Sequence, residues 1–351
     1  MMNVSERIGV WLATVGFFLF AISALGQEAA SRPALPPPAT RPESPEVLPG
    51  KGLAQHPFLY AGEWDTRKKF QTMFLVRDGK VVWSYSMPNK DENGNVTEFD
   101  DATQLSNGNI VFTRKVGASE ITPDKKVIWN YIAPKGCEVH SIQPIDANRV
   151  LIMQNGNPAK LMIINTTSGT TEKEMILPTK NSGVHGQFRH IRMTAAGTFL
   201  VSHMDMGKVI EYDADGKEIW SVAAPSCWAA VRLKNGNTLI SGNQRCYARE
   251  VNPKGEIVWE LTPKDLPEYK IFNIQECDRL ANGNTVVANW VAGDKNHSHW
   301  PDSVQILEVN PEKKVVWALR SWTDPADLGP SSSIQLLDEP GIPEKPGDLQ
   351  H

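Results

Sequence analysis

Apolar and polar positions alternate in short runs along the chain from about residue 56 onward, and these runs recur with a common period. One run follows a turn built from Asp, Pro, Gly or Lys and carries Trp at a fixed place. Its copies stand at Trp83, Trp129, Trp220, Trp259 and Trp317, with a degenerate copy at Glu174. Successive copies are 46, 45, 46, 39 and 58 residues apart. A repeat of about 40–50 residues with several strands is typical of a β-propeller blade.

A second pattern alternates with the first and has the form Leu-x-Asn-Gly-Asn. It starts at Leu105, Leu233 and Leu280, and weaker versions cover residues 145–151 and 193–200. Asn-Gly between two apolar runs predicts a β-hairpin, with a type I′ turn in which both central residues have positive φ. Each repeat is therefore expected to form a small antiparallel sheet.

The two ends of the repeat region complement each other. Residues 333–338 resemble residues 141–146, which begin a blade, yet nothing after them completes a sheet. Residues 58–83 supply outer strands without an inner one. The sequence thus predicts an all-β, six-bladed β-propeller closed by pairing of N- and C-terminal strands in one blade, which leaves no open sheet edge.

The N-terminal region has a different composition. Arg7, the apolar residues 8–25 and a small-residue site at 24–26 predict a signal peptide over residues 1–26, with an uncleaved membrane anchor as the alternative. We therefore expect export to the periplasm or the extracellular space, without stable membrane insertion after cleavage. Seven prolines in residues 31–50 predict a disordered linker over 27–54, before a propeller at 55–340 and a loose tail at 341–351.

Composition and charge limit the classes of molecule that the protein is expected to bind. The 351 residues carry a net charge of −4 and no basic stripe, which argues against a nucleic-acid partner. A small-molecule ligand or substrate is the expected partner, and the sequence identifies no protein partner. The chain has four cysteines, and an exported protein can retain a disulfide, so the sequence does not decide whether one disulfide forms.

The innermost strand of each blade lines the central channel, so residues at the starts of inner strands converge there. Those positions carry imidazole, guanidinium, carboxylate and amide groups. Histidine transfers protons near neutral pH, and an arginine fork binds carboxylate, sulfate or phosphate. The alternative is that these groups bond to neighbouring loops and join blades. The catalytic candidates are His140, His185, His190 and Arg192, and the ligand-binding candidates are Asp101, Gln143, Gln187, Arg189, Trp228, Arg232, Glu276, Arg279 and Gln335.

Imidazoles with a carboxylate also suit zinc, copper or non-haem iron. The candidate ligands are His140, His185, His190, His203 and Glu276. No helix-spaced His pair or compact ligand motif accompanies them, so we assign no metal site from the sequence. The periodic tryptophans are interpreted as packing between blades. Trp228, Trp290 and Trp322 fall outside that phase and are interpreted as platforms for a planar or sugar ligand.

The Leu-x-Asn-Gly-Asn turns, the Glu250-Val251-Asn252-Pro253 sequence before Trp259 and the polar channel together resemble the quinoprotein-like β-propeller superfamily, over roughly residues 56–340. Its repeats are like those of pyrroloquinoline-quinone-binding proteins. The chain lacks the adjacent cysteines and the regular docking motif of quinoprotein alcohol dehydrogenases, so we assign no quinone cofactor.

The repeats also resemble, more weakly, those of the bacterial arylsulfotransferases, although the additional N-terminal β domain of that family is missing. This resemblance implies sulfuryl transfer through a channel histidine, with nearby arginines stabilising the sulfuryl oxygens. The corresponding positions here are His140, His185 or His190 for the nucleophile and Arg192, Arg232 or Arg279 for the cations.

Three functions therefore stay open, and with them the question of whether the protein is an enzyme. The first is binding of a small anionic or polyhydroxylated ligand in a funnel lined by His and Arg, with group-transfer or lyase chemistry on that ligand. The second is arylsulfotransferase-like sulfuryl transfer. The third is a non-catalytic scaffold that binds proteins through its rim loops.

Overall fold

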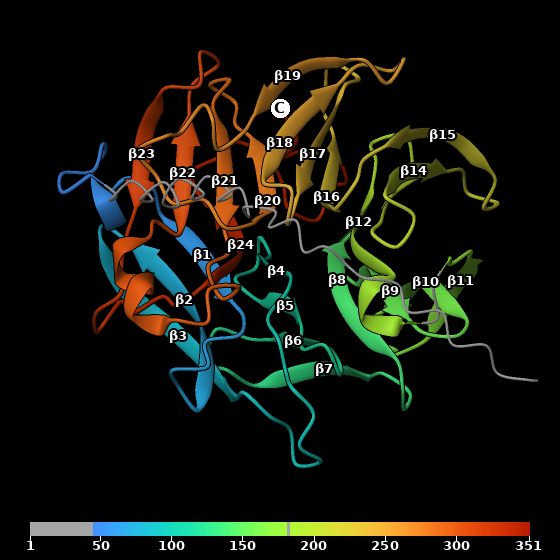
Figure 1. Ribbon diagram of the computed structural model, residues 1–351. Helices are drawn as coiled ribbons and strands as arrows, with labels where there is room; N and C mark the ends of the chain where they lie inside the picture. The colour runs from blue at the N-terminus through green and yellow to red at the C-terminus, as the bar shows by residue number, and fades with distance from the viewer. Residues whose placement is uncertain (1–44, 181–182) are drawn as a thin grey trace, which may run out of the picture. The chain divides into compact units, whose positions relative to one another are not determined.

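The computed structural model describes residues 45–180 and 183–351, so the expected signal peptide and most of the expected linker lie outside the described residues. Six four-stranded antiparallel sheets stand in a ring around a central channel (Figure 1). The prediction of an all-β, six-bladed β-propeller is confirmed. Among the described residues, we find no helix with the length and apolar character needed to span a membrane.

The first blade is built from both ends of the repeat region. From the channel outward it consists of β24 (Ser331–Leu336), β1 (Phe58–Gly62), β2 (Phe70–Arg77) and β3 (Lys80–Pro88). Phe58 pairs with Leu336 and Tyr60 with Ile334. All four side chains belong to one hydrophobic core cluster with Trp317 of the preceding blade. The predicted closure of the ring by the C-terminal strand is therefore present.

The other five blades each follow one after another along the chain, from the inner to the outer strand. The second and third consist of β4 (Ala102–Gln104), β5 (Ile110–Thr113), β6 (Gly117–Ile121), β7 (Val127–Ile132), β8 (Glu138–Pro144), β9 (Arg149–Asn155), β10 (Ala159–Asn165) and β11 (Thr171–Leu177). The fourth to sixth consist of β12 (Phe188–Met193), β13 (Phe199–His203), β14 (Lys208–Tyr212), β15 (Glu218–Ala223), β16 (Cys227–Arg232), β17 (Thr238–Gly242), β18 (Tyr247–Val251), β19 (Ile257–Leu261), β20 (Ile274–Arg279), β21 (Thr285–Asn289), β22 (Ile306–Val309) and β23 (Val315–Leu319).

The Asn-Gly motifs form the predicted hairpins, but their turn type differs from the prediction. Between β4 and β5 the Gly108 N–H donates to Leu105 O at 2.9 Å, and Gly108 has a φ of +89° while Asn107 does not have positive φ. This is a turn closed by a glycine in the left-handed region, with a longer loop than type I′. The type I′ geometry occurs instead between β2 and β3, where Asp78 and Gly79 have φ values of +50° and +73°.

Three of the repeated tryptophans join one blade to the next by a hydrogen bond. The indole N–H of Trp83 donates to Pro123 O at 2.8 Å, and that of Trp220 donates to Pro253 O at 2.9 Å. Each proline lies in the turn between the two outer strands of the following blade. Trp259 is bonded in the same way to Pro311 O at 3.1 Å. The Trp run and the Pro turn of the repeat are thus two halves of one contact between blades.

Part of the expected linker is ordered against the last blade. Pro49 O accepts from the Ala318 N–H at 3.1 Å, and Gly52 O, in the short 3₁₀ helix η1 (Gly52–Ala54), accepts from the Trp317 indole at 2.9 Å. Leu53 packs against the core of that blade. The prediction of a disordered linker up to residue 54 is therefore wrong for residues 49–54, because these residues cover the outer strand β23.

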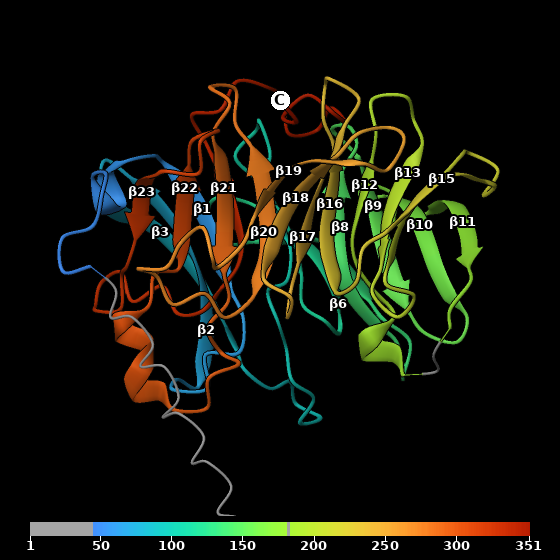
Figure 2. The same ribbon diagram turned by 45° about the horizontal axis from the view of Figure 1, so that its top comes forward.

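The C-terminal residues, for which the sequence predicted a loose tail, are bonded to the hairpin turns at one end of the ring. Glu344 accepts from the Ser106 N–H at 2.6 Å, and Gln350 O accepts from the Lys234 N–H at 3.1 Å. Ser106 and Lys234 occupy the x position of two Leu-x-Asn-Gly-Asn turns. Figure 2 shows this segment lying over one end of the inner strands. The four cysteines form no disulfide.

Candidate functional site

The inner strands run from one mouth of the channel to the other, and this separates the predicted site residues. We call the mouth where the inner strands begin, near the 3₁₀ helix η2 (Val184–Gly186), the η2 mouth. We call the opposite mouth, covered by residues 341–351, the tail mouth. In Figure 2 the two lie at opposite ends of the inner strands. Residues at strand starts thus meet at one end and residues at strand ends at the other.

His140 is held between two carboxylates at the η2 mouth. It lies on β8 and is 1% exposed, with Nδ1 2.9 Å from Asp100 Oδ2 and Nε2 2.8 Å from Glu138 Oε2. Burial and the charge of Arg189 lower the pKa of His140, although Glu138 opposes them. Both ring nitrogens are engaged within the protein, so this imidazole is a bridging group.

His185 is the histidine that reaches the open side of this mouth. Its side chain is half exposed; Nδ1 lies 2.8 Å from Glu138 Oε2 and Nε2 3.1 Å from Arg189 Nη2. Because a guanidinium only donates hydrogen bonds, Nε2 must accept, and Nδ1–H donates to Glu138. The two contacts together select the neutral tautomer with its lone pair on Nε2.

Glu138 links the two histidines. Burial raises the pKa of this carboxyl, but hydrogen bonds from His140 and His185 outweigh burial and hold the pKa well below its usual range. Glu138 therefore stays ionised and orients His185. The sequence analysis missed it, although strand alternation places Glu138 and His140 on one face of β8.

Arg189 is a buried cation without an ion-pair partner among the described residues. It is 2% exposed, Nη1 donates to Phe188 O at 2.9 Å, and its Nε has no hydrogen-bond partner there. The guanidinium carbon lies 4.5 Å from the ring centroid of Trp228. A buried charge is normally paired. An anionic group from outside the protein would complete this arrangement.

A cavity of about 510 Å³ opens at the η2 mouth and is lined by His185, Arg189 and Trp228. Several of its lining residues carry buried polar atoms without a hydrogen-bond partner among the described residues. These atoms are Trp228 Nε1, Trp290 Nε1, Asn243 Oδ1 and Gln275 Oε1. Buried polar groups are almost always hydrogen-bonded, so their gathering around one cavity indicates a polar occupant.

Of the three tryptophans outside the repeat phase, Trp228 and Trp290 line this cavity, as the sequence interpretation expects. Trp322 does not. Its indole N–H donates to Ser303 O at 2.8 Å, and its ring packs against Trp300 of the 3₁₀ helix η3 (His297–Asp302). Trp322 is part of the packing beneath the η3 loop.

A second group of predicted residues lies deeper in the channel and is ion-paired. Arg192 donates to both carboxylate oxygens of Asp101, at 2.8 and 3.1 Å, and Glu276 Oε1 lies 3.8 Å from Arg192. Burial raises the pKa of Asp101, but the charge of Arg192 opposes burial, and the pKa of Asp101 is lowered overall. Burial, the main effect, and Arg192 lower the pKa of His190 to about 4, although Asp101 opposes them. This group joins the second, fourth and sixth blades.

The remaining predicted residues bond between elements of the ring and are not brought to the cavity. Gln187 Oε1 accepts from the Gly156 N–H at 2.8 Å, and Gln143 Oε1 accepts from the Met193 N–H at 2.6 Å. Gln335 Oε1 accepts from the Gln104 N–H at 2.7 Å. These side chains form contacts between neighbouring blades, which is the alternative role that the sequence analysis left open.

Arg232 and Arg279 also lie away from the cavity, toward the tail mouth. Arg232 pairs with Glu211 and stacks on Trp220 at 4.6 Å. Arg279 pairs with Glu250 at 2.8 Å. Both arginines sit at the ends of inner strands, so the direction of the strand carries them to the opposite mouth from Arg189.

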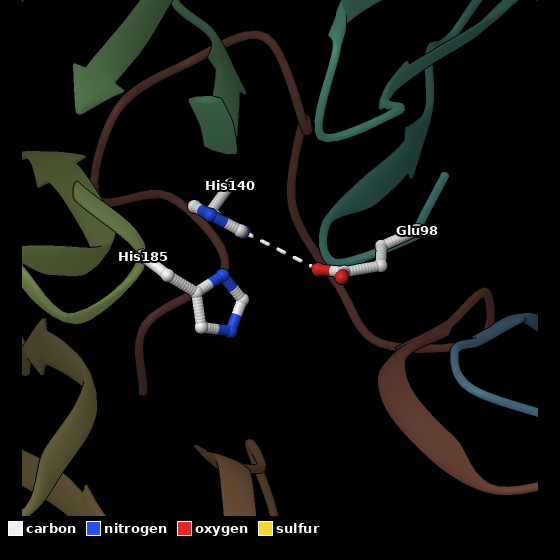
Figure 3. A group of neighbouring side chains, drawn as sticks. All are labelled: Glu98, His140 and His185. Carbon is white, nitrogen blue, oxygen red and sulfur yellow. Dashed lines mark ion pairs between the residues drawn. The ribbon is translucent and has the colours of Figure 1, made fainter. Parts of the chain in front are cut away.

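Three groups among the described residues bring metal-ligating atoms within 4.8 Å of one another: Glu98 with His140 and His185, Asp101 with His190 and Glu276, and Glu63 with Glu98 and Asp100. Figure 3 shows the first group, in which His140 Nδ1 lies 3.7 Å from Glu98 Oε2. The sequence analysis missed Glu63 and Glu98. His203 joins none of these groups; it packs on Phe188 and is 2.8 Å from the Tyr212 hydroxyl.

No family model matches the chain, and no curated protein matches it. Among solved structures, a protein of unknown function from Bacteroides caccae is similar over 80% of this chain and 97% of its own, with 24% identity and a TM-score of 0.69. A catalytically inactive virginiamycin B lyase from Staphylococcus aureus with quinupristin is similar over 80% and 90%, with 13% identity and a TM-score of 0.51. The quinoprotein and arylsulfotransferase resemblances stay expectations. The strand topology and the comparisons agree that this chain is a six-bladed β-propeller.

Proposed function

We propose that the protein binds a small anionic, hydroxylated molecule in the cavity at the η2 mouth and that His185 transfers a proton of that molecule. The observation that carries the proposal is the set of buried polar atoms without a partner among the described residues that line the cavity, on Trp228, Trp290 and Asn243. Their donors and acceptors match the hydroxyl groups of a sugar-like ligand.

Arg189 supplies the recognition of negative charge. Its guanidinium is buried, stacked on Trp228 and without a carboxylate partner among the described residues. A guanidinium fork suits a carboxylate, because two parallel N–H groups match its two oxygens. The indole face of Trp228 adds an apolar platform. A ligand with a carboxylate on a hydroxylated ring, such as a uronic acid, satisfies both groups.

The chemistry follows from the Glu138, His185 and Arg189 contacts. A ligand carboxylate that accepts from Arg189 competes with His185 Nε2 for the guanidinium and frees the lone pair of that nitrogen. Nε2 then takes the proton from the carbon beside the carboxylate, and ionised Glu138 stabilises the imidazolium that forms. The electron pair moves into the carboxylate system and expels the substituent on the next carbon, leaving a C=C bond. This is a lyase reaction.

In the arylsulfotransferase alternative, His185 Nε2 would act as a nucleophile toward sulfur and not as a base. His185 lines the cavity and is half exposed, whereas His140 is buried with both ring nitrogens bonded to carboxylates. His185 is therefore the better nucleophile of the two for the arylsulfotransferase alternative. Mass spectrometry after incubation with p-nitrophenyl sulfate tests it: the added mass of one sulfuryl group on a His185 peptide would replace the lyase proposal.

The binding proposal is tested by calorimetric titration with D-glucuronate and, as the neutral comparator, D-glucose. The Arg189→Gln variant is expected to weaken glucuronate binding at least tenfold. Arg232→Gln is the matched control, since Arg232 also stacks on a tryptophan but at the tail mouth. Equal affinity in wild type and Arg189→Gln, or equal losses in both variants, would contradict the proposal, as would a wild type that binds none of glucuronate, galacturonate, citrate and sulfate.

A further inference from the structure

Three carboxylates gather beneath the cavity, in the η2 mouth. Glu63 follows β1, and Glu98 and Asp100 precede β4, so the group joins the first and second blades. The three residues are only 1–2% exposed. One oxygen from each lies within 4.8 Å of one oxygen from each of the others. Buried like charges at this separation repel strongly, because little water screens them.

The donors of the protein satisfy only part of this group. Lys115 Nζ lies 3.0 Å from Glu98 Oε1, and His140 Nδ1 lies 2.9 Å from Asp100 Oδ2. Glu98 Oε2 and Asp100 Oδ1 have no hydrogen-bond partner among the described residues. Two acceptor oxygens of this buried group therefore receive no hydrogen bond from the described residues.

Gln275, on a different blade, adds an independent observation. Its Nε2 donates to Glu63 Oε1 at 3.2 Å, which places the carboxamide beside the three carboxylates. The side chain is 1% exposed, and its Oε1 also has no hydrogen-bond partner among the described residues. Glu63, Glu98 and Gln275 all line the cavity, so the group adjoins it.

The electrostatic state of the group supports the same conclusion. Burial, followed by the charges of Asp100 and Glu98, raises the pKa of Glu63 well above its usual value. Burial, followed by the charge of Glu98, raises the pKa of Asp100 in the same way.

The geometry favours an oxygen-only site over the histidine group of Figure 3. The ligand oxygens lie within 4.8 Å of one another, and a Ca²⁺ ion bound at ~2.3–2.6 Å from each oxygen can bridge separations of this size. In the group of Glu98, His140 and His185, the ring nitrogens are already bonded, and the Arg189 cation lies 3.1 Å from His185 Nε2.

We propose that Glu63, Glu98 and Asp100 bind one divalent cation of the calcium class, with the Gln275 carboxamide and water from the cavity as further oxygen ligands. The site does not depend on the proposed function, since the cation binds in the absence of any organic ligand. It would, however, place a positive charge at the floor of the cavity in which an anionic ligand is proposed to bind.

Calorimetric titration of chelator-stripped protein with CaCl₂, without any organic ligand, tests the proposal. We expect one bound equivalent, and an affinity at least tenfold lower in Glu98→Gln and in Asp100→Asn. Glu276→Gln is the matched control, a buried carboxylate of the ion-paired group deeper in the channel, and it should bind like wild type. Circular dichroism confirms that each variant is folded.

A measurement on the wild type keeps the test independent of the variants. Calcium should raise the melting temperature of the stripped protein, because an ion bound only by the folded state stabilises it. If neither Ca²⁺ nor Mn²⁺ binds the wild type, or if Glu276→Gln loses binding while Glu98→Gln retains it, the proposal is overturned. Failure of glucuronate binding with retained Ca²⁺ binding would overturn the proposed function alone.

Discussion

The guanidinium of Arg189 stacks on Trp228 with 4.5 Å from its carbon to the ring centroid, and this is the same contact that Arg232 makes with Trp220 at 4.6 Å. The difference lies in the second partner. Arg232 also pairs with Glu211, whereas no carboxylate of the described residues pairs with Arg189. Arg232 is fully used in holding two blades together. Arg189 retains charge and hydrogen-bonding capacity for a group that enters from the cavity.

His185→Gln is expected to abolish turnover of a bound 4-O-substituted glucuronate, whose C4 substituent is the leaving group, while changing its affinity less than threefold. Glutamine keeps a polar group at the cavity but cannot take up a proton at neutral pH. The measurement is the absorbance of the unsaturated product alongside calorimetric binding. His299→Gln is the matched control, since His299 is equally exposed and also lies 2.8 Å from a carboxylate, Asp294. Full turnover in His185→Gln would exclude this residue as the base.

His203 should make the protein less stable in acid. Burial, with a smaller effect of the Lys208 charge, lowers the pKa of this imidazole from 6.5 to about 3. Below pH 6.5 the unfolded chain binds a proton that the folded protein does not bind until about pH 3, so the free energy of unfolding falls as the pH falls through this window.

The slope from one such group is at most about 1.4 kcal/mol per pH unit. Thermal melts between pH 7 and pH 4 should show a shallower acid decline in His203→Gln than in wild type, even where the variant is less stable at pH 7. An unchanged decline would show that other groups control acid stability.

Trp220→Phe should lower the free energy of unfolding by about 1–2 kcal/mol, because it removes a hydrogen bond and part of a cation–π contact. The indole N–H of Trp220 donates to Pro253 O of the next blade, and Arg232 stacks on its ring. Urea denaturation measures the change. Trp83→Phe, which removes the equivalent bond to Pro123, should have a similar effect. No loss in either variant would mean that ring packing alone holds the blades.

Deleting residues 341–351 should open the tail mouth without affecting the cavity at the η2 mouth. These residues cover a space of about 120 Å³ beside Arg192 and Glu276 and are bonded to Ser106 and Lys234. We expect a lower melting temperature and faster amide hydrogen exchange in β20 and β24, because water reaches the deeper ion-paired group. Glucuronate affinity should stay within twofold of wild type. A tenfold loss of that affinity would show that the two mouths are coupled.

The repeated sequence pattern was sufficient to predict the β-propeller architecture. The repeat of Trp runs and Asn-Gly turns determined six blades, since each short apolar run can bury its side chains only by stacking against the next repeat. The incomplete first and last repeats determined that β24 joins β1. The same pattern did not resolve the turn at Gly108, because a hairpin motif predicts a reversal of the chain more reliably than the φ of each turn residue.

The site depended on the tertiary structure. The structure brings together His140, His185, Arg189 and Trp228, which the sequence placed at or near inner-strand starts. Arg232 lies on the same strand as Trp228 and Arg279 lies on β20, but both are at the far ends of their strands and so reach the tail mouth instead.

Glu63 and Glu98 could not be connected from the sequence, because one follows the second strand of its blade and the other precedes an inner strand. Closure of the ring brings them together. Whether a buried polar group pairs with a neighbour or stays available to a ligand depends on contacts between blades, which no linear pattern encodes.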